Sequence, residues 1–398
     1  MPASAPPFDP LDAEFIADPY PIYAKLRGEA EVHWHALLGQ AVTVSHRACS
    51  AVLRNPALQR VWADREPAAE LTAFNLLHRN SMLETSPPRH TRLRRLVSAA
   101  FNRGHTERLR PTVQAVADRL VARLADEITE NGSADLVTAV AGPLPIEVIA
   151  ELLGVPPADR GLLQPWSNAI VKMYEYGTPE HLRRDAERAA AEFIGYLREL
   201  IAARCRRPGE DLVSDLVSVA EHGQLTADEV VGTAALLLMA GHEATVNVLG
   251  NGTLALLTHR HQWRRLVSDP ALLPTAVEEL IRFDSPLQIF ERTATVDVEI
   301  AGWLVPAGEK IAALLGAAAR DPALFPDPDC LDVGRAPNPH LGFGLGIHYC
   351  LGAPLARIEV EAALRALATA LPGLTVAGEP TRRPEFAIRG LRDLPVTA

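Results

Sequence analysis

A single cysteine closely follows a glycine-rich loop in the last quarter of the sequence. The loop contains Gly342, Gly344 and Gly346, and Cys350 lies just before an apolar, alanine-rich stretch whose pattern predicts a helix. Because glycine readily adopts positive φ, such a loop can pass close to a flat ligand. Backbone amides at the start of a helix favour an ionised thiol, and a thiolate can ligate an iron centre. We therefore expect Cys350 to be a metal ligand.

The alternative is that Cys350 is a small buried hydrophobic residue beside an ordinary turn. Against this, the order Phe-Gly-x-Gly-x-His-x-Cys-x-Gly-x-x-Leu-Ala-Arg resembles, at every position, the haem-binding signature of the cytochrome P450 family of haem-thiolate monooxygenases. The resemblance implies a mainly α fold, the cytochrome P450 fold, in which a large helical domain carries a small β-rich lobe. It also implies that haem b is bound through the Cys350 thiolate.

The composition is compatible with such an enzyme. A chain of 398 residues, 48% of them hydrophobic, can bury a large core. We expect one domain over residues 1–398, with the β-rich lobe mainly at 30–60 and 290–315. The N-terminus lacks the features of a signal peptide, and the longest apolar run, 234–240, is too short to span a bilayer. The protein is therefore expected to be cytoplasmic and monomeric, without a membrane partner.

Charge and cysteine usage exclude several other classes. The formal net charge of −10 disfavours nucleic acid as the main partner. The cysteines are scattered and contain no Cys-x-x-Cys pair, which argues against a disulfide framework or a zinc site. Cys350 is therefore the one cysteine that we single out as a ligand.

A long predicted helix carries the second group of candidate residues. Thr226-Ala-Asp-Glu229 is a capping box, and no helix breaker follows before His259. The centre of this helix is apolar until polar residues begin at His242, and polar groups in a buried helix need a partner or a purpose. A glycine beside an acid favours a local opening of the helix in which dioxygen can sit.

This stretch resembles the family's oxygen-binding motif, in which an acid is directly followed by threonine. The resemblance places Ala240 and Gly241 against the haem and keeps the acid as Glu243, but the threonine position holds Ala244. Thr245 follows one residue later, and one residue turns a side chain by about 100°, so it is not a simple substitute. The proton relay is then expected to be a water held by Glu243 or Thr245, or a hydroxyl on the substrate. A buried ion pair is the structural alternative for Glu243.

Basic residues elsewhere resemble the family's ligands of the haem propionates. His90 and Arg94 lie four apart on one face of a helix predicted from Ser86, its expected cap, to Phe101. A basic pair is a suitable partner for a buried carboxylate, although a solvated helix face is the alternative. The resemblance implies further haem contacts at Arg292, Phe343, Gly344, His348 and Gly352. It also gives Glu279, Arg282 and Arg335 a structural role as the family's Glu-x-x-Arg plus Arg network.

Substrate contacts are expected from three regions. By resemblance, the irregular stretch 62–84 and a helix over 166–177 cover the substrate, and the extended segment 285–294 lines its cavity. Ordinary core packing explains the apolar residues of 166–177 equally well. The predicted pocket residues are Leu77, Met82, Met173, Met239, Leu287, Ile289 and Phe290.

The leading functional hypothesis is hydroxylation or epoxidation of a mid-sized, largely apolar natural product in secondary metabolism, with O2 as oxidant. Electrons are expected from NAD(P)H through a ferredoxin reductase and a ferredoxin, or a flavodoxin, that docks on the arginine-rich segment 89–110. One alternative is oxidative aryl or phenol coupling without oxygen insertion. Another is a haem-thiolate sensor or binding protein without turnover. The position of Ala244 favours both alternatives slightly.

Overall fold

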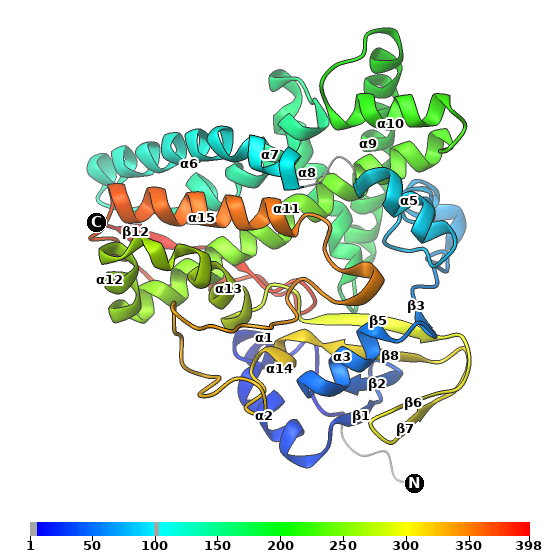
Figure 1. Cartoon of the computed structure of the whole chain (residues 1–398), viewed down its shortest axis with the longest axis horizontal. Coiled ribbons are helices and arrows are strands. Elements are labelled where there is room, and N and C mark those ends of the chain that lie inside the picture. The colour runs from blue at the N-terminus through cyan, green and yellow to red at the C-terminus, as the bar shows by residue number, and fades with distance from the viewer. Residues whose placement is uncertain (1–5, 99–102) are drawn as a thin grey trace. The chain divides into compact units, whose positions relative to one another are not determined.

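The structure is a computed structural model that describes residues 6–98 and 103–398 (Figure 1). It is mainly helical, with small sheets, as expected. The α-helices are α1 (Ala13–Ala17), α2 (Tyr20–Glu29), α3 (His46–Arg54), α4 (Thr72–Arg79), α5 (Arg89–Ser98), α6 (Arg103–Asn131), α7 (Pro143–Leu153), α8 (Arg160–Val171), α9 (Glu180–Arg206), α10 (Leu212–Glu221), α11 (Ala227–Thr258), α12 (Arg260–Ser268), α13 (Leu273–Phe283), α14 (Leu315–Ala319) and α15 (Ala353–Ala370). Within the described ranges, no helix combines the length and the apolar character needed to cross a bilayer.

The strands are short. They are β1 (Val32–His35), β2 (Gln40–Thr43), β3 (Leu58–Gln59), β4 (Ala134–Asp135), β5 (Ile289–Ala294), β6 (Val298–Ile300), β7 (Trp303–Val305), β8 (Lys310–Leu314), β9 (Thr375–Val376), β10 (Thr381–Arg382), β11 (Leu391–Asp393) and β12 (Pro395–Thr397). The largest sheet has five strands in the order β1-β2-β8-β5-β3, in which only β2 and β8 pair in parallel.

Two compact units divide the chain. The first comprises Met1–Gln59, Ala117–Ala141 and Ala244–Ala398, and the second comprises Arg60–Val116 and Gly142–Glu243. Helix α11 continues through the division at Glu243, so residues of the predicted oxygen-binding motif belong to both units. The prediction of a single domain stays a prediction.

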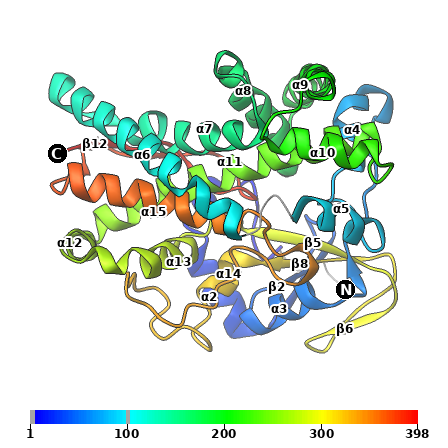
Figure 2. The same cartoon turned by 45° about the horizontal axis from the view of Figure 1, so that its top comes forward.

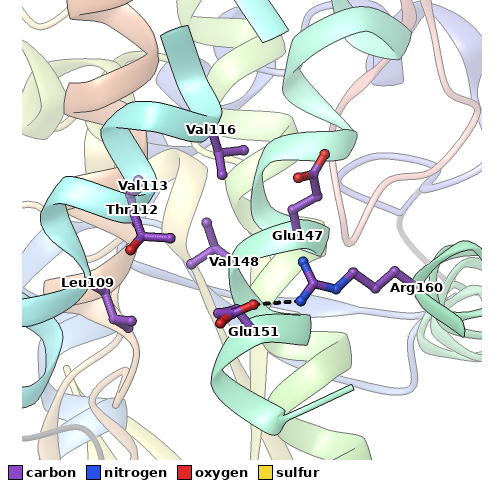
Figure 3. A pocket seen from close by; sticks show the side chains of 8 residues that line it. All are labelled: Leu109, Thr112, Val113, Val116, Glu147, Val148, Glu151 and Arg160. Carbon is purple, nitrogen blue, oxygen red and sulfur yellow. Dashed lines mark hydrogen bonds and ion pairs between the residues drawn. The ribbon is translucent and has the colours of Figure 1, made fainter. Parts of the chain in front are cut away.

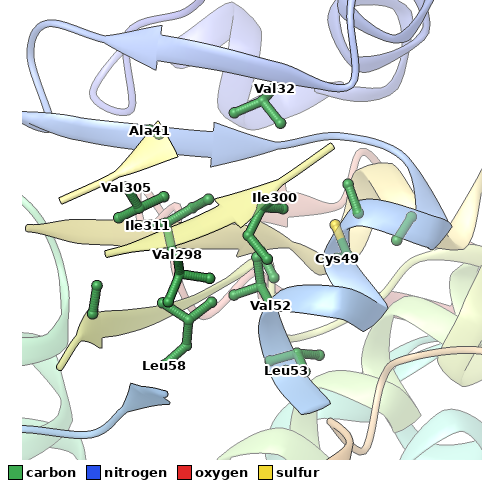
Figure 4. Close-up of a cluster of buried hydrophobic side chains, with 14 of the residues drawn as sticks. Val32, Ala41, Cys49, Val52, Leu53, Leu58, Val298, Ile300, Val305 and Ile311 are labelled. Carbon is green, nitrogen blue, oxygen red and sulfur yellow. The ribbon is translucent and has the colours of Figure 1, made fainter. Parts of the chain in front are cut away.

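The core of the sheet in the first unit is a cluster of buried aliphatic side chains. It includes Val52 and Leu53 of α3, Ile311 of β8 and residues of the β6–β7 hairpin (Figure 4). Leu341, at the start of the glycine-rich loop, belongs to the same cluster, and Leu345 packs against it. Fully burying one such side chain stabilises a fold by about 1.5–3 kcal/mol. The cluster therefore holds the beginning of the cysteine loop firmly against the sheet.

Helices form the second unit. Helix α8 lies against α9, and α10 also contacts α9 (Figures 1 and 2). The carboxylate of Glu187 on α9 accepts hydrogen bonds from the first amides of α4, those of Ala73 at 2.8 Å and Phe74 at 2.9 Å. These amides have no partner within their own helix turn, so a residue distant in sequence caps α4.

The capping box at the start of α11 is confirmed. The Thr226 hydroxyl accepts the Glu229 amide at 3.2 Å, and the Glu229 carboxylate accepts the Thr226 amide at 3.1 Å. Glu229 also forms ion pairs with Arg89 at 3.1 Å and Arg92 at 2.5 Å. The helix ends at Thr258, directly before His259, as predicted, and is roughly 50 Å long.

Two local predictions were wrong. The stretch 62–84 is not irregular throughout, because α4 forms within it and buries Phe74 and Leu77. The Ser86 side chain does not cap α5, because its hydroxyl donates to the Arg60 carbonyl at 2.7 Å. Helix α5 begins at Arg89, and Ser86 contacts its first turn through the backbone, where the Ser86 carbonyl accepts the His90 amide at 3.0 Å. The predicted end of this helix, Phe101, lies outside the described residues.

Candidate active site

The cysteine loop joins the core of the first unit to the start of α15. The Cys350 amide donates to the Phe343 carbonyl at 2.8 Å, which closes the loop on itself. Helix α15 begins three residues later at Ala353, as predicted, and the Cys350 side chain is exposed. An exposed sulfur beside a helix N-terminus is the arrangement that favours a thiolate ligand.

Glycines allow the backbone conformation of the cysteine loop. Gly344 and Gly346 have φ of +67° and +70°, as the sequence predicted for the loop. A Cβ at residue 346 would lie 2.6 Å from the Leu53 carbonyl oxygen, so a side chain there meets backbone as well as strain. Gly342 differs, because its φ is not positive and its close neighbour is the Ile281 side chain, 2.4 Å from an added Cβ.

An ion-pair network braces the loop from α13 and α15. Arg357 donates to both carboxylate oxygens of Glu278, at 2.6 and 2.9 Å, and His340 contacts the same carboxylate at 3.1 Å. Burial disfavours ionisation of Glu278, but the hydrogen bonds from Arg357 and His340 outweigh it and lower its pKa to about 2. The Arg357 guanidinium also lies 4.5 Å from the centre of the Phe343 ring. Sequence reasoning missed Glu278, His340 and Arg357.

The residues of this unit fit a thiolate-ligated haem. The sulfur is accessible, and Gly352 leaves space beside it, since a Cβ there would lie 4.0 Å from Cys350 Sγ. Arg292 on β5 is only 4% exposed, and a buried guanidinium suits a carboxylate such as a haem propionate. Phe290, also on β5, lies beside Gly344. A carbon of the Phe290 ring would lie 3.4 Å from a Cβ added at Gly344. His348 ends a 3₁₀ turn, η6 (Gly346–His348), in the same loop.

The other two predicted propionate ligands lie on α5, in the second unit. His90 is 1% exposed, and burial together with the neighbouring Arg94 lowers its pKa to about 4. His90 is therefore neutral near pH 7 and can serve as a hydrogen-bond donor, whereas Arg94 carries the positive charge. Burial beside a guanidinium disfavours an imidazolium. The role of His90 and Arg94 as propionate ligands stays a prediction.

The structure brings Glu279, Arg282 and Arg335 together. Arg282 donates to both Glu279 oxygens at 2.7 Å, and Arg335 lies 3.1 Å from the same carboxylate. Glu279 and Arg282 are fully buried. Arg282 also donates to the carbonyls of Ala319 and Pro328, each at 2.8 Å, so the pair fixes the segments before the cysteine loop. Their structural role stays a prediction.

The centre of α11 presents small residues. Ala240 is exposed and Ala244, one turn later, is half-buried, whereas Met239, His242 and Glu243 are buried. Small side chains four residues apart leave room on one helix face for a flat ligand. The predicted opening of the helix was wrong, because α11 is regular through Gly241. At Gly241 an added Cβ would lie 3.1 Å from the Ile149 side chain of α7, so a larger residue would crowd Ile149.

Buried polar groups flank this face within each unit. In the second unit, Glu243 is 4% exposed and its carboxylate lies 3.7 Å from His242 Nε2. In the first unit, Thr245 forms a hydrogen bond with Glu359 of α15, a buried acid that sequence reasoning missed. Burial raises the pKa of Glu359 well above its usual range, against the weaker effect of the Thr245 hydrogen bond. Burial therefore favours the protonated form of Glu359.

The predicted substrate residues fall into two groups. Leu77, Met82, Met173 and Met239 are buried in the second unit, where His78 of α4 contacts the Tyr174 hydroxyl at 2.9 Å. This contact joins α4 to the 3₁₀ turn η4 (Lys172–Tyr174) that follows α8. The predicted helix over 166–177 began and ended too late: α8 spans Arg160–Val171, and η4 follows it.

In the first unit, Leu287 and Phe290 pack against the core cluster, and Ile289 starts β5. Leu287 also forms a β-bridge with Ile388 of the C-terminal segment. The roles of all these residues in substrate binding stay predictions.

A surface pocket in the second unit lies apart from these residues. It is formed by α6, α7 and the start of α8, and Arg160 there pairs with Glu151 at 2.5 Å (Figure 3). None of the predicted substrate residues lines it. We assign it no role in the reaction.

Comparisons with known proteins agree with this geometry. The sequence profile described as "Cytochrome P450" matches residues 163–369. The chain is 42% identical over 406 residues to "Cytochrome P450 monooxygenase PikC" of Streptomyces venezuelae, covering 99% of this chain and 95% of that protein. It is also 42% identical over 327 residues to "Mycinamicin IV hydroxylase/epoxidase" of Micromonospora griseorubida, covering 80% of each.

Among solved structures, P450BioI in complex with hexadec-9Z-enoic acid ligated acyl carrier protein is similar, with a TM-score of 0.91 at 34% identity. The match covers 97% of this chain and 100% of that chain. Sequence and fold are thus similar over nearly the whole length.

Proposed function

Because this chain belongs to the cytochrome P450 family and is a monooxygenase, we propose that it hydroxylates or epoxidises a mid-sized, largely apolar natural product in secondary metabolism. The observation that carries the proposal is the exposed Cys350 sulfur, held between a glycine loop and the start of α15. A relative with 42% identity that is described as a hydroxylase/epoxidase supports the reaction type.

Cys350 is the proposed iron ligand. Bound through this thiolate, haem supplies dioxygen activation and oxygen transfer to carbon. Arg292 and Arg94 are proposed to neutralise its carboxylates, while His90 and His348 donate hydrogen bonds to them. Gly352 leaves no side chain beside the sulfur, and Gly344 leaves none beside the Phe290 ring.

Proton delivery is proposed to use groups other than the usual threonine. Ala244 has no hydroxyl, and the Thr245 hydroxyl is engaged with the Glu359 carboxyl. In its protonated form, Glu359 of α15 can donate to Thr245 Oγ1, the adjacent group that can pass the proton on. Glu243 is the acid of α11 that is proposed to take part in the same relay. We propose that a water, or a hydroxyl of the substrate, completes the path that Ala244 leaves open.

Electrons are proposed to arrive from NAD(P)H through a ferredoxin reductase and a small ferredoxin or flavodoxin. The basic residues of α5 support this proposal, in particular Arg95, which is exposed. Arg89 and Arg92 contribute less free charge because they pair with Glu229.

A second candidate reaction is oxidative aryl or phenol coupling, which removes hydrogen without inserting oxygen. The observation that favours it is Ala244, because the missing hydroxyl weakens the proton relay that oxygen insertion needs.

An oxygen-18 experiment separates the two reactions. A library of natural products would first be screened for compounds that shift the haem spin state, and each hit would then be turned over under ¹⁸O2 with surrogate ferredoxin, reductase and NADPH. One ¹⁸O atom in the product is the expected result. A dehydrogenated or coupled product without ¹⁸O would favour coupling. If none of the compounds increases the rate of NADPH oxidation, none of them is a substrate for monooxygenation.

A further inference from the structure

A buried polar chain runs from α8 to the acid of α11 within the second unit. The Ser167 hydroxyl lies 3.2 Å from His242 Nδ1, and His242 Nε2 lies 3.7 Å from a Glu243 carboxylate oxygen. Ser167 is 0% exposed, His242 1% and Glu243 4%. The Ser167–His242 contact is within hydrogen-bond distance, whereas His242 and Glu243 are close enough to interact electrostatically but not to form a hydrogen bond. Polar groups placed together at such burial are costly, so their arrangement is specific.

The imidazole ring of His242 has two tautomers, and each of them suits one protonation state of Glu243. With the ring proton on Nε2, His242 faces a carboxylate and accepts the Ser167 hydroxyl at Nδ1. With the proton on Nδ1, the ring donates to Ser167 and presents a lone pair to a carboxylic acid. A hydroxyl can donate or accept, so Ser167 serves both tautomers. Either tautomer therefore keeps the Ser167 hydrogen bond and turns a different partial charge toward Glu243 across 3.7 Å.

Helix α8 sets the position of Ser167. Its buried residues Leu163 and Ile170 lie one turn before and after Ser167, and α8 packs on α9. Any displacement of α8 moves the hydroxyl away from His242, which sits on α11. From this geometry, and resting on the proposed role of Glu243 as a proton source, we infer that His242 and Ser167 are positioning residues. They make proton delivery by Glu243 depend on the seating of α8 against α11.

Four variants of the holoenzyme test this inference. His242→Phe removes the ring nitrogens and keeps an aromatic volume, whereas His242→Gln keeps a group that can hydrogen-bond on both sides. Ser167→Ala removes only the hydroxyl. Asn168→Ala, which removes a neighbouring polar side chain of α8, is the matched control. The measured quantities are product formed per NADPH, peroxide released and the equilibrium spin-state shift with substrate.

We expect His242→Phe and Ser167→Ala to bind substrate as the parent does but to lose product per NADPH by about fivefold, the usual effect of one hydrogen bond. His242→Gln should recover most of this loss, and Asn168→Ala should show none. Loss of substrate binding in step with coupling, or no recovery in His242→Gln, would show a merely structural role and overturn the inference.

A spectroscopic measurement does not depend on turnover. In the diamagnetic ferrous carbonyl form, ¹⁵N-labelled histidine gives ring nitrogen shifts that report the tautomer of His242. Both Ser167→Ala and Glu243→Gln should move these shifts, and Asn168→Ala should not. Unmoved shifts in either of the first two variants would refute the bridge. If Glu243→Gln leaves coupling intact, the proposed proton role of Glu243 fails instead, independently of the bridge.

Discussion

At the scale of single residues, Gly346 is the position of the cysteine loop where a side chain would be most disruptive. Its φ is +70°, and an added Cβ would meet the Leu53 carbonyl at 2.6 Å. Gly308 has a similar φ of +88° but nothing within 4 Å, so it is a matched control for strain alone. We expect Gly308→Ala to lower the free energy of unfolding by about 1–2 kcal/mol and Gly346→Ala to lower it further and to reduce haem content. Denaturation and haem absorbance check this, and equal effects of the two changes would contradict it.

Glu359 gives a prediction for the dependence of stability on pH. Burial raises its pKa in the folded protein, so the folded state keeps a proton that the unfolded state loses above about pH 4.3. Its contribution is therefore fully present below that pH and is lost as pH rises toward the folded pKa. Relative to Glu359→Gln, the parent should lose stability as pH rises above about 5, by up to about 1.4 kcal/mol per pH unit.

Denaturation of both proteins across this range measures the difference. Glu361→Gln, on the same helix and paired with Arg365 near the surface, should follow the parent. If the free energies of unfolding of the parent and of Glu359→Gln change in parallel with pH, Glu359 is ionised in the folded protein.

Residue types alone do not reveal such roles. Cys350 stood out because a long motif surrounds it, and Glu243 because it interrupts an apolar helix. Glu359 carries a similar signal, since it lies between Ile358 and Val360 in an alanine-rich helix. Ser167 carries none, because a serine in an amphipathic helix is ordinary and only its contact with His242 gives it a role.

At the scale of elements, α4 depends on a partner far away in the sequence. The Glu187 carboxylate accepts its first amides, and a lost cap typically costs about 1 kcal/mol, or roughly fivefold in local opening. Hydrogen exchange should therefore be faster in α4 of Glu187→Gln, with little change in α10. Glu192→Gln, which alters a neighbouring carboxylate of α9 that accepts the Trp166 indole, is the control. Exchange in α4 that matches the parent would mean that burial of Phe74 and Leu77 suffices to hold the helix.

Element boundaries were predictable wherever glycine, proline or a capping box marks them. Gly132 and Gly154 directly follow α6 and α7, and Pro208 lies two residues after the last residue of α9. Elements held by distant partners were not predictable. Helix α4 needs Glu187, and the two-residue strand β4 exists only because β12 pairs with it.

At the scale of the whole molecule, the family membership was predictable because the motifs extend over most of the chain. The acidic net charge also gives a testable consequence for electron transfer. Arg95→Glu should slow reduction by ferredoxin, and more so at low salt, because exposed charges act on association and are screened by ions. Arg206→Glu, an equal change of charge at an exposed position of α9, is the control. Stopped-flow measurements of the reduction rate at several ionic strengths check this. Equal rates for Arg95→Glu and Arg206→Glu would count against the docking proposal.

The central claim is that the Cys350 thiolate is the iron ligand. The most direct measurement is the absorption spectrum of the ferrous carbonyl complex, whose long-wavelength band marks thiolate ligation in this family. The band should be present in the parent and in the controls Cys205→Ala and Cys330→Ala, which remove the other exposed thiols. It should be absent in Cys350→Ala, even if that variant still binds haem. Persistence of the band in Cys350→Ala, or its loss in either control, would contradict the assignment.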